Sequence, residues 1–207
     1  MSNSIENIIW DFDGVIFFSE KIRIEGFKYA LEGESHRNID EFLEFHAANG
    51  GLSRYDKFER FIQKNSKNEE VIEVYLRKYS EYMNENLFDE TLKNNDVIEF
   101  IKHNKQYKHF IASASDEKEL INLCYYLNIY NLFDSILGSP LNKNKNVSKL
   151  ILENQLSLKK TILIGDAIND EIAANHNGIK FVPYNNITLE ANSKSKIIPQ
   201  ENLIIIK

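Results

Sequence analysis

Short apolar runs alternate along the chain with longer segments of helical periodicity. Five runs are continuous rather than alternating, as expected for strands buried on both faces of a parallel sheet. They are Ile8–Trp10, His109–Ala112, Ser135–Leu137, Thr161–Ile164 and Ile179–Val182. The helical patterns between the later runs span Val97–His103, Glu117–Leu127, Val147–Asn154 and Ile168–Asn177. This order predicts an α/β fold, a parallel sheet flanked by helices. A last apolar run, Leu203–Ile206, would add an edge strand.

One long segment breaks this alternation. Between about Phe18 and Phe88 there is no strand pattern, only helical periodicity rich in Glu, Lys, Phe and Tyr. The sequence therefore predicts an all-helical insertion after the first strand, at residues 18–88. The sheet would then be built from residues 1–17 and 89–207.

Composition and charge narrow the classes of function. The 207 residues carry 25 Lys and Arg against 31 Asp and Glu, a formal net charge of -6, so we expect no nucleic-acid partner. The single cysteine, Cys124, excludes an internal disulfide and is interpreted as a buried packing thiol. No apolar run approaches the roughly 20 residues of a spanning helix, and the first residues lack the pattern of a signal peptide. We expect a cytoplasmic protein with no membrane partner.

Two carboxylates follow the first strand directly, in Asp11-Phe12-Asp13-Gly14-Val15. Side chains alternate along a strand, so Asp11 and Asp13 point the same way at its carboxyl end. Ligands of open α/β sheets bind at these ends. Two carboxylates are costly to bury without a partner, and a divalent cation is the natural partner.

A second acidic pair follows the fourth run, in Ile164-Gly165-Asp166-Ala167-Ile168-Asn169-Asp170. Asp166 stands at the strand tip, and Asp170 lies one helical turn beyond on the same side. Such a cluster of hard oxygen ligands suits Mg²⁺. There are alternatives: Asp166 as a helix N-cap and Asp170 as a solvated acid in the first turn.

The second run ends in Ser113-Ala114-Ser115-Asp116. Ser115 or Asp116 is expected to cap the following helix. Ser113 lies earlier, at the strand edge, where its hydroxyl and the Ala114 N–H could hold a phosphoryl oxygen.

A loop containing Lys143 and Lys145 follows the third run, in Gly138-Ser139-Pro140-Leu141-Asn142-Lys143-Asn144-Lys145. A lysine here could lean over the same sheet edge and neutralise phosphate charge. The alternative is that both lysines are simply exposed to solvent.

Taken in order, Asp-x-Asp-Gly-Val, Ser, Lys and Gly-Asp-x-x-x-Asp resemble the four motifs of the haloacid dehalogenase superfamily, in its beta-phosphoglucomutase and phosphoglycolate phosphatase branch. The resemblance covers about residues 5–14 and 97–184. It implies a Rossmann-like core, at residues 1–17 and 89–207, and a helical cap at residues 18–88. It favours Lys143 over Lys145, because the apolar residues Val147 and Ile151 follow Lys143 by four and eight positions.

The resemblance also implies roles for individual residues. Asp11 would be the nucleophile that forms an aspartyl-phosphate. Asp13 would protonate the leaving oxygen and then deprotonate the attacking water. Mg²⁺ would be held by Asp11, the main-chain carbonyl of Asp13 and Asp166, with Asp170 supporting the site directly or indirectly.

Further residues would bind the phosphoryl group of the substrate. Ser113, Ala114 and Gly14 would contact it, and Lys143 together with Mg²⁺ would offset the repulsion between carboxylate and phosphate.

The implied function is hydrolysis of a small phosphorylated metabolite by a monomer or weak dimer. Asp13 argues against a dehalogenase, which needs no acid at that position, and against a P-type ATPase, which carries Thr there. A phosphomutase of the beta-phosphoglucomutase type shares all four motifs and remains an alternative. A catalytically silent phosphate-ligand binding protein and a nucleic-acid-binding module are others. All four motif acids are retained, which argues against the silent binder, and the acidic balance argues against the nucleic-acid module.

Specificity is expected in the cap segment Asn49-Gly50-Gly51-Leu52-Ser53-Arg54-Tyr55-Asp56-Lys57-Phe58. Gly50 and Gly51 permit a tight turn with positive φ, and Ser53 is a candidate N-cap. Arg54 and Lys57, three residues apart, could bind a second anionic group of the substrate; the alternative is a helix start with solvated basic residues. The segment resembles one in superfamily members of bacterial surface-sugar pathways, which favours a sugar phosphate or an acidic sugar phosphate.

Overall fold

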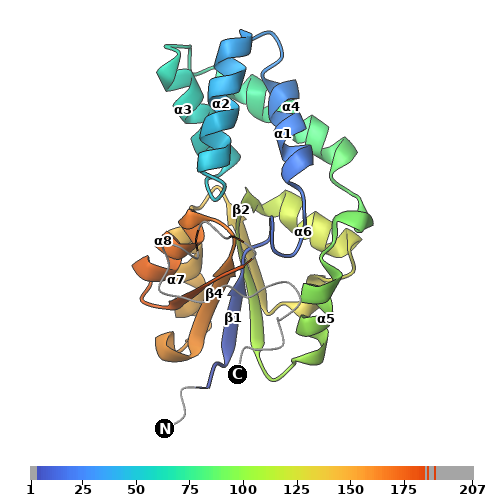
Figure 1. Cartoon of the computed structure of the whole chain (residues 1–207), viewed down its shortest axis with the longest axis vertical. Coiled ribbons are helices and arrows are strands. Elements are labelled where there is room, and N and C mark those ends of the chain that lie inside the picture. The colour runs from blue at the N-terminus through green and yellow to red at the C-terminus, as the bar shows by residue number, and fades with distance from the viewer. Residues whose placement is uncertain (1–3, 185, 187–188, 190–207) are drawn as a thin grey trace.

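In the computed structural model, which describes residues 4–184, 186 and 189, the described strands form one five-stranded parallel sheet (Figure 1). The strands are β1 (Asn7–Trp10), β2 (Lys108–Asp116), β3 (Ser135–Ser139), β4 (Thr161–Gly165) and β5 (Lys180–Pro183). Their order is β3-β2-β1-β4-β5, with Trp10 of β1 opposite Ile111 and Ile164. β1 is therefore central, and the parallel α/β fold is confirmed.

Helices cover both faces of the sheet. Ile8 and Trp10 of β1 pack with α5 (Asn95–His103) and α6 (Glu117–Tyr126), whereas Ile9 faces α7 (Lys143–Glu153) and α8 (Ile168–His176). This division follows from the alternation of side chains along a strand. Both faces are buried, which is why the strands are continuous apolar runs.

Two boundaries differ from the sequence prediction by four residues, and the others by at most two. β2 runs on to Asp116, and α7 begins at Lys143, four residues earlier than its apolar positions indicate. The cause at α7 is a cap: the Asn142 side chain accepts a hydrogen bond of 3.0 Å from the Lys145 N–H. Short 3₁₀ turns lie at Glu90–Leu92, Tyr130–Leu132 and Leu158–Lys160. The expected strand Leu203–Ile206 falls outside the described residues.

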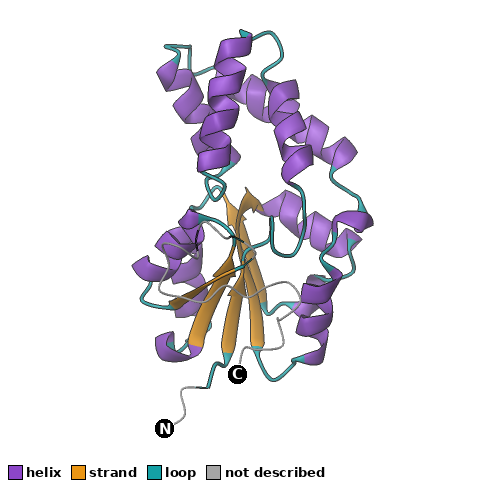
Figure 2. Ribbon diagram, viewed as in Figure 1, coloured by secondary structure: helices purple, strands orange, loops and turns teal. Residues whose placement is uncertain are grey.

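The insertion after β1 is all helical, as predicted (Figure 2). Its helices are α1 (Glu20–Ala30), α2 (His36–Ala48), α3 (Arg54–Lys64) and α4 (Val71–Asn86). An aromatic core holds them together. The Phe27 ring lies 4.4 Å from Tyr79, 5.0 Å from Phe42 and 5.5 Å from Phe58, centroid to centroid. Such aromatic pairs add to the stabilisation from buried apolar area. We refer to these four helices as the cap.

Two linkers join the cap to the core and run side by side. The Phe18 N–H donates to the Leu92 carbonyl at 2.8 Å, and the Asn94 N–H donates to the Ile16 carbonyl at 2.9 Å. The Asn94 side chain donates to the Val15 carbonyl at 2.8 Å. The linkers thus place the cap over the carboxyl ends of the strands, where the predicted site lies (Figure 1).

Candidate active site

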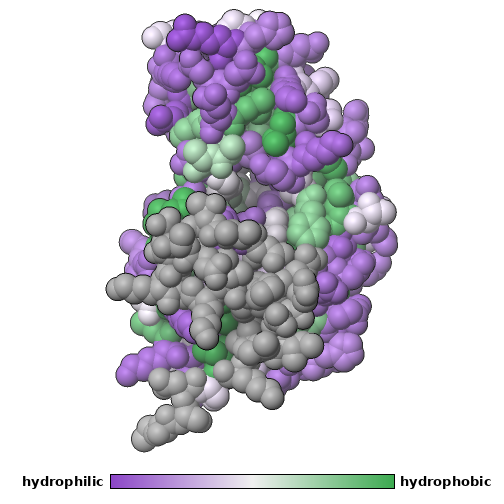
Figure 3. All heavy atoms as spheres, viewed as in Figure 1, coloured by the Kyte–Doolittle hydropathy of each residue, from purple (hydrophilic) through white to green (hydrophobic). Residues whose placement is uncertain are grey.

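A chamber of about 510 Å³ lies between the cap and the carboxyl edge of the sheet. The hollow between the two parts is visible in the space-filling view (Figure 3). Its walls include seven of the residues singled out in the sequence: Asp11, Asp13, Gly14, Ser113, Ala114, Lys143 and Asp166. The fold therefore brings residues from four separate strand ends to one place.

Lys143 ties two of the carboxylates together. Its ammonium lies 2.7 Å from Asp11 Oδ1 and also donates to Asp170 Oδ1. Burial opposes the charge on Lys143, but Asp11 and Asp170 outweigh it and raise the pKa above its usual value. Lys145, two residues further along α7 and therefore on another side of the helix, is exposed. Lys143 is thus the lysine in the chamber.

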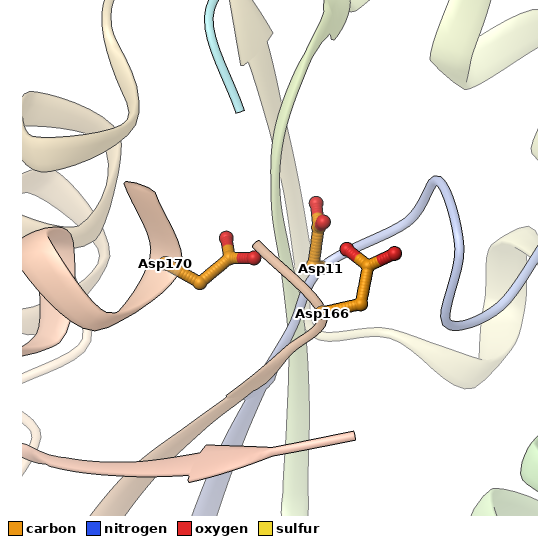
Figure 4. Close-up of side chains that lie close together, drawn as sticks. All are labelled: Asp11, Asp166 and Asp170. Carbon is orange, nitrogen blue, oxygen red and sulfur yellow. The ribbon is translucent and has the colours of Figure 1, made fainter. Parts of the chain in front are cut away.

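Asp11, Asp166 and Asp170 form an acidic cluster (Figure 4). One carboxylate oxygen from each lies within 4.8 Å of the others. Burial and the neighbouring Asp170 raise the pKa of Asp166 to about 7 and hold that of Asp11 well above its usual value. Lys143 is the only basic side chain among the described residues that forms ion pairs with these acids, and its single charge leaves the three acids short of positive charge. Hard, negatively charged oxygen donors that lack compensating positive charge suit Mg²⁺.

The alternatives considered from sequence, Asp166 as a helix N-cap and Asp170 as a solvated acid, are both wrong. Asp170 is fully buried, so it is not a solvated acid. The N-cap of α8 is Ala167 rather than Asp166, and Asp170 Oδ2 accepts a 3.0 Å hydrogen bond from the Ala167 N–H. Both oxygens of Asp170 are therefore engaged, one by Lys143 and one by the backbone.

Two glycines make room for these acids. Gly14 has a φ of +82°, and a Cβ there would overlap the Asp166 carboxylate. A Cβ on Gly165 would overlap the Asp170 carboxyl group in the same way. A side chain at either position would displace an acid from the cluster.

Three of the described residues hold Asp13, and the sequence analysis identified none of them in this role. The Asp13 carboxylate accepts from Ser19 Oγ at 2.5 Å, Arg23 Nε at 2.8 Å and Ser115 Oγ at 2.5 Å. Burial alone raises the pKa of Asp13, but Arg23 and the two hydroxyls outweigh it and lower that pKa below its usual value. The arrangement shown holds Asp13 as a carboxylate.

Ser113 and Ser115 lie in the last part of β2, where the pairing with β3 is irregular between Ala112 and Asp116. Ser113 is fully buried, and its hydroxyl accepts from the Ser115 N–H at 3.1 Å. The cap of α6 is Asp116, whose side chain accepts from the Glu119 N–H at 3.0 Å. Ser115 was considered from sequence only as a helix cap, and no sequence pattern pointed to Ser115, Ser19 or Arg23 as a partner of Asp13.

The first turn of α3 is tied to the core. Arg54 Nη2 lies 2.7 and 2.6 Å from the two oxygens of Glu119 in α6, and the Tyr55 hydroxyl donates to Asp116 at 2.8 Å. Arg23 reaches the same Glu119 at 3.2 Å. Arg54 and Lys57 are only 6% and 3% exposed, so the reading of a solvated helix start is wrong. The guanidinium of Arg54 is already neutralised by a carboxylate of the protein itself.

The glycine pair of the cap loop serves a different purpose from the one predicted. Neither Gly50 nor Gly51 has a positive φ. A Cβ on Gly51 would lie 2.5 Å from the Cβ of Asn169, so glycine is needed because the loop is seated against α8. Ser53 caps α3 as predicted, in a capping box with Asp56.

Comparison with known proteins shows the family to which the chain belongs. The sequence profile of the haloacid dehalogenase-like hydrolases matches residues 8–183, from β1 to β5. The chain belongs to the haloacid dehalogenase-like hydrolase family. The resemblance drawn from the four motifs is thereby confirmed.

Solved structures with this fold are similar over nearly the full chain. A haloacid dehalogenase-like family hydrolase from Streptococcus pneumoniae has a TM-score of 0.73 at 19% identity, covering 99% of this chain and 98% of that one. A predicted phosphoglycolate phosphatase from Haemophilus somnus has a TM-score of 0.76 at 18% identity, and the match covers 100% of this chain and 99% of that one. A beta-phosphoglucomutase from Clostridium difficile has a TM-score of 0.74 at 19% identity, and the match covers 96% of this chain and 93% of that one. A search of the curated proteins found no match.

None of the described helices is long and apolar enough to cross a membrane.

Proposed function

We propose that this family member is a Mg²⁺-dependent phosphatase that hydrolyses a small phosphate monoester, such as a sugar phosphate, through an aspartyl-phosphate on Asp11. The observation that carries the proposal is the position of Asp11. It lies at the end of the central strand, 2.7 Å from a buried ammonium and in the wall of a chamber shared with Asp13 and Ser113. The proposal is supported by the family's description as hydrolases.

In the first step, an Asp11 oxygen forms a bond to phosphorus while the bond from phosphorus to the ester oxygen breaks. Asp13 supplies the proton that this oxygen needs to leave as an alcohol. An incoming phosphate carries negative charge close to Asp13 and thereby favours its protonated form. Ser113 and the Ala114 N–H, on the chamber wall, bind the phosphoryl oxygens, and Gly14 lets the phosphate approach closely.

In the second step, water attacks phosphorus, Asp13 takes its proton and the bond between phosphorus and Asp11 breaks. The products are inorganic phosphate and the original enzyme. Arg23, Ser19 and Ser115 suit this step, because they favour the carboxylate form of Asp13 that accepts a proton. The same residue thus gives and regains one proton in each cycle.

The acidic cluster fits Mg²⁺, which would be held by Asp11, Asp166 and the main-chain carbonyl of Asp13. When bound, it supplies the positive charge that lets a carboxylate approach a phosphate. Asp170 holds Lys143 and Ala167, so we assign it the support of the site rather than direct ligation. Lys143 contributes the remaining positive charge from the protein.

The test is hydrolysis of p-nitrophenyl phosphate with and without Mg²⁺, followed through both p-nitrophenol and inorganic phosphate. The wild type is compared with Asp11→Asn and with Asp40→Asn, an exposed acid of α2 that serves as a matched control. We expect Mg²⁺-dependent release in the wild type and in Asp40→Asn, and none in Asp11→Asn. Equal activity in Asp11→Asn would refute the mechanism. Release of p-nitrophenol without inorganic phosphate would favour phosphoryl transfer, as in a mutase.

A further inference from the structure

A small recess of about 40 Å³ opens under the cap, next to the chamber. The two share Asp13, Glu20, Gly50 and Ala114, so a group held in the recess is adjacent to the proposed acid–base residue. The far side of the recess is formed by cap residues, among them Phe27, His46 and Lys57. A substrate whose phosphate lies at Asp11 would therefore extend its leaving group into this recess.

Lys57 and His46 form a buried pair there. Each is 3% exposed, and Lys57 Nζ lies 2.8 Å from His46 Nδ1. When Nδ1 accepts from the ammonium, the hydrogen of the neutral imidazole is on Nε2. His46 Nε2 faces Glu20 at 3.4 Å without making a hydrogen bond to any described residue. Two N–H groups of Lys57 also have no acceptor among the described residues.

Lys57 differs from the two arginines of the same region. Arg54 is paired with Glu119, and Arg23 with Asp13 and Glu119. Among the residues that the structure describes, the His46 imidazole is the only polar group in direct contact with the Lys57 ammonium. Burial lowers the pKa of Lys57 to about 7, although the more distant Glu20 favours its charge. A buried ammonium that lacks a counterion, with donors facing a cavity, fits an anion that arrives with the substrate.

The size of the recess narrows the choice of anion. On the same measure a cavity of roughly 10–15 Å³ holds one water molecule, so the recess has room for about three non-hydrogen atoms. A carboxylate has three, whereas a phosphate has five. The aromatic face of Phe27, 5.7 Å from Lys57 Nζ, closes one side.

We propose that the recess recognises a carboxylate on the leaving group, and that Lys57, held by His46, donates hydrogen bonds to it. This inference rests on the proposed phosphatase function and names its substrate class, a phosphate monoester of a hydroxy acid. It also gives different roles to Arg54 and Lys57 of α3. Lys57 binds the substrate, whereas Arg54 ties the cap to Glu119.

The test uses substrates that differ in charge but not in shape. We compare the phosphate monoester of glycolic acid with its primary amide, and the next longer pair, 3-hydroxypropanoic acid phosphate and its amide. Binding is measured by calorimetry with Mg²⁺ in the Asp11→Asn background, so that the result does not depend on turnover. Lys57→Met is added to this background, with Lys64→Met on the exposed side of α3 as the matched control and Lys57→Gln as a second variant.

The Asp11→Asn protein that retains Lys57 should bind at least one of the two phosphorylated acids more tightly than the corresponding amide. Because a hydrogen bond to a charged group is worth roughly 1.5–3 kcal/mol, Lys57→Met should weaken binding of that acid on the order of 10- to 100-fold and change the amide much less. Lys64→Met should leave the ratio of acid to amide unchanged.

Two results would overturn the inference: equal affinities for acid and amide, or a ratio that survives both Lys57→Met and Lys57→Gln. Equal affinities would point to recognition of neutral hydroxyl groups instead. Failure of the phosphatase proposal is a separate result, because it shows as absent Asp11-dependent hydrolysis of p-nitrophenyl phosphate. A preference for the acid in binding would still support the recess as a carboxylate site.

Discussion

The stability of the protein should depend on pH through Lys57. The pKa of this buried ammonium is about 7 in the folded protein, against an ordinary value of 10.5. Between these values the unfolded chain binds more protons than the folded protein, so the free energy of unfolding rises with pH. The cost of the buried charge is fully present below pH 7 and disappears as pH approaches 10.5.

The magnitude follows from the same two values. A tenfold difference in proton affinity corresponds to about 1.4 kcal/mol. From pH 7, where Lys57 is half protonated in the folded state, to pH 9, where the unfolded chain still holds the proton, the wild type should gain about 2 kcal/mol relative to Lys57→Met. Lys57→Met should also be the more stable protein at pH 7, because it buries a side chain of similar length without a charge.

The assay is urea unfolding at pH 7, 8 and 9, followed by circular dichroism. Wild type, Lys57→Met and the exposed control Lys64→Met are compared at one ionic strength, and the difference between two curves removes the titration of all shared groups. Lys64→Met should stay parallel to the wild type. Curves for wild type and Lys57→Met that stay parallel from pH 7 to pH 9 would refute the reasoning, because they would mean that Lys57 keeps an ordinary proton affinity.

Three further effects are expected. Arg54→Met leaves the buried Glu119 carboxylate with only its longer ion pair to Arg23. The substitution should therefore lower the free energy of unfolding, measured in urea, by about 3 kcal/mol. A loss well under 1 kcal/mol would contradict a stabilising role for the Arg54–Glu119 ion pair. Ser115→Ala removes a hydrogen bond to the Asp13 carboxylate and should lower kcat/KM for p-nitrophenyl phosphate at least about tenfold. A kcat/KM equal to that of the wild type would show that this hydrogen bond does not contribute to catalysis. Adding Mg²⁺ should raise the Tm of the wild type but not of Asp166→Asn; an equal shift in both would place the ion elsewhere.

Strand ends were the most predictable feature of this chain. Asp11, Ser113 and Asp166 each follow a continuous apolar run, and parallel strands bring such ends to one edge. Local rules also predicted the Ser53 cap, because a capping box needs only residues close in sequence. What the pattern could not supply was the start of α7, where Asn142 caps a turn that carries no apolar residue.

Contacts between distant segments were out of reach of the sequence patterns. Arg54 was expected to face the substrate, but Glu119 of a core helix, 65 positions away, neutralises it. Gly51 was interpreted through backbone conformation, yet its cause is the nearness of Asn169. In both cases the deciding partner lies on another element, and its identity follows only from how the cap is seated on the core.

The ion pairs around Asp13 form one connected path from the cap to the site. Arg54 of α3 contacts Glu119, Glu119 contacts Arg23, and Arg23 contacts Asp13. Because Glu119 is buried, a cap that moves away would leave it short of positive charge, which is costly. Seating of the cap and the placement of Asp13 are therefore energetically linked. Lys57 stands beside this path, buried and without an ion pair to any carboxylate of the described residues, so its ammonium is available to a ligand.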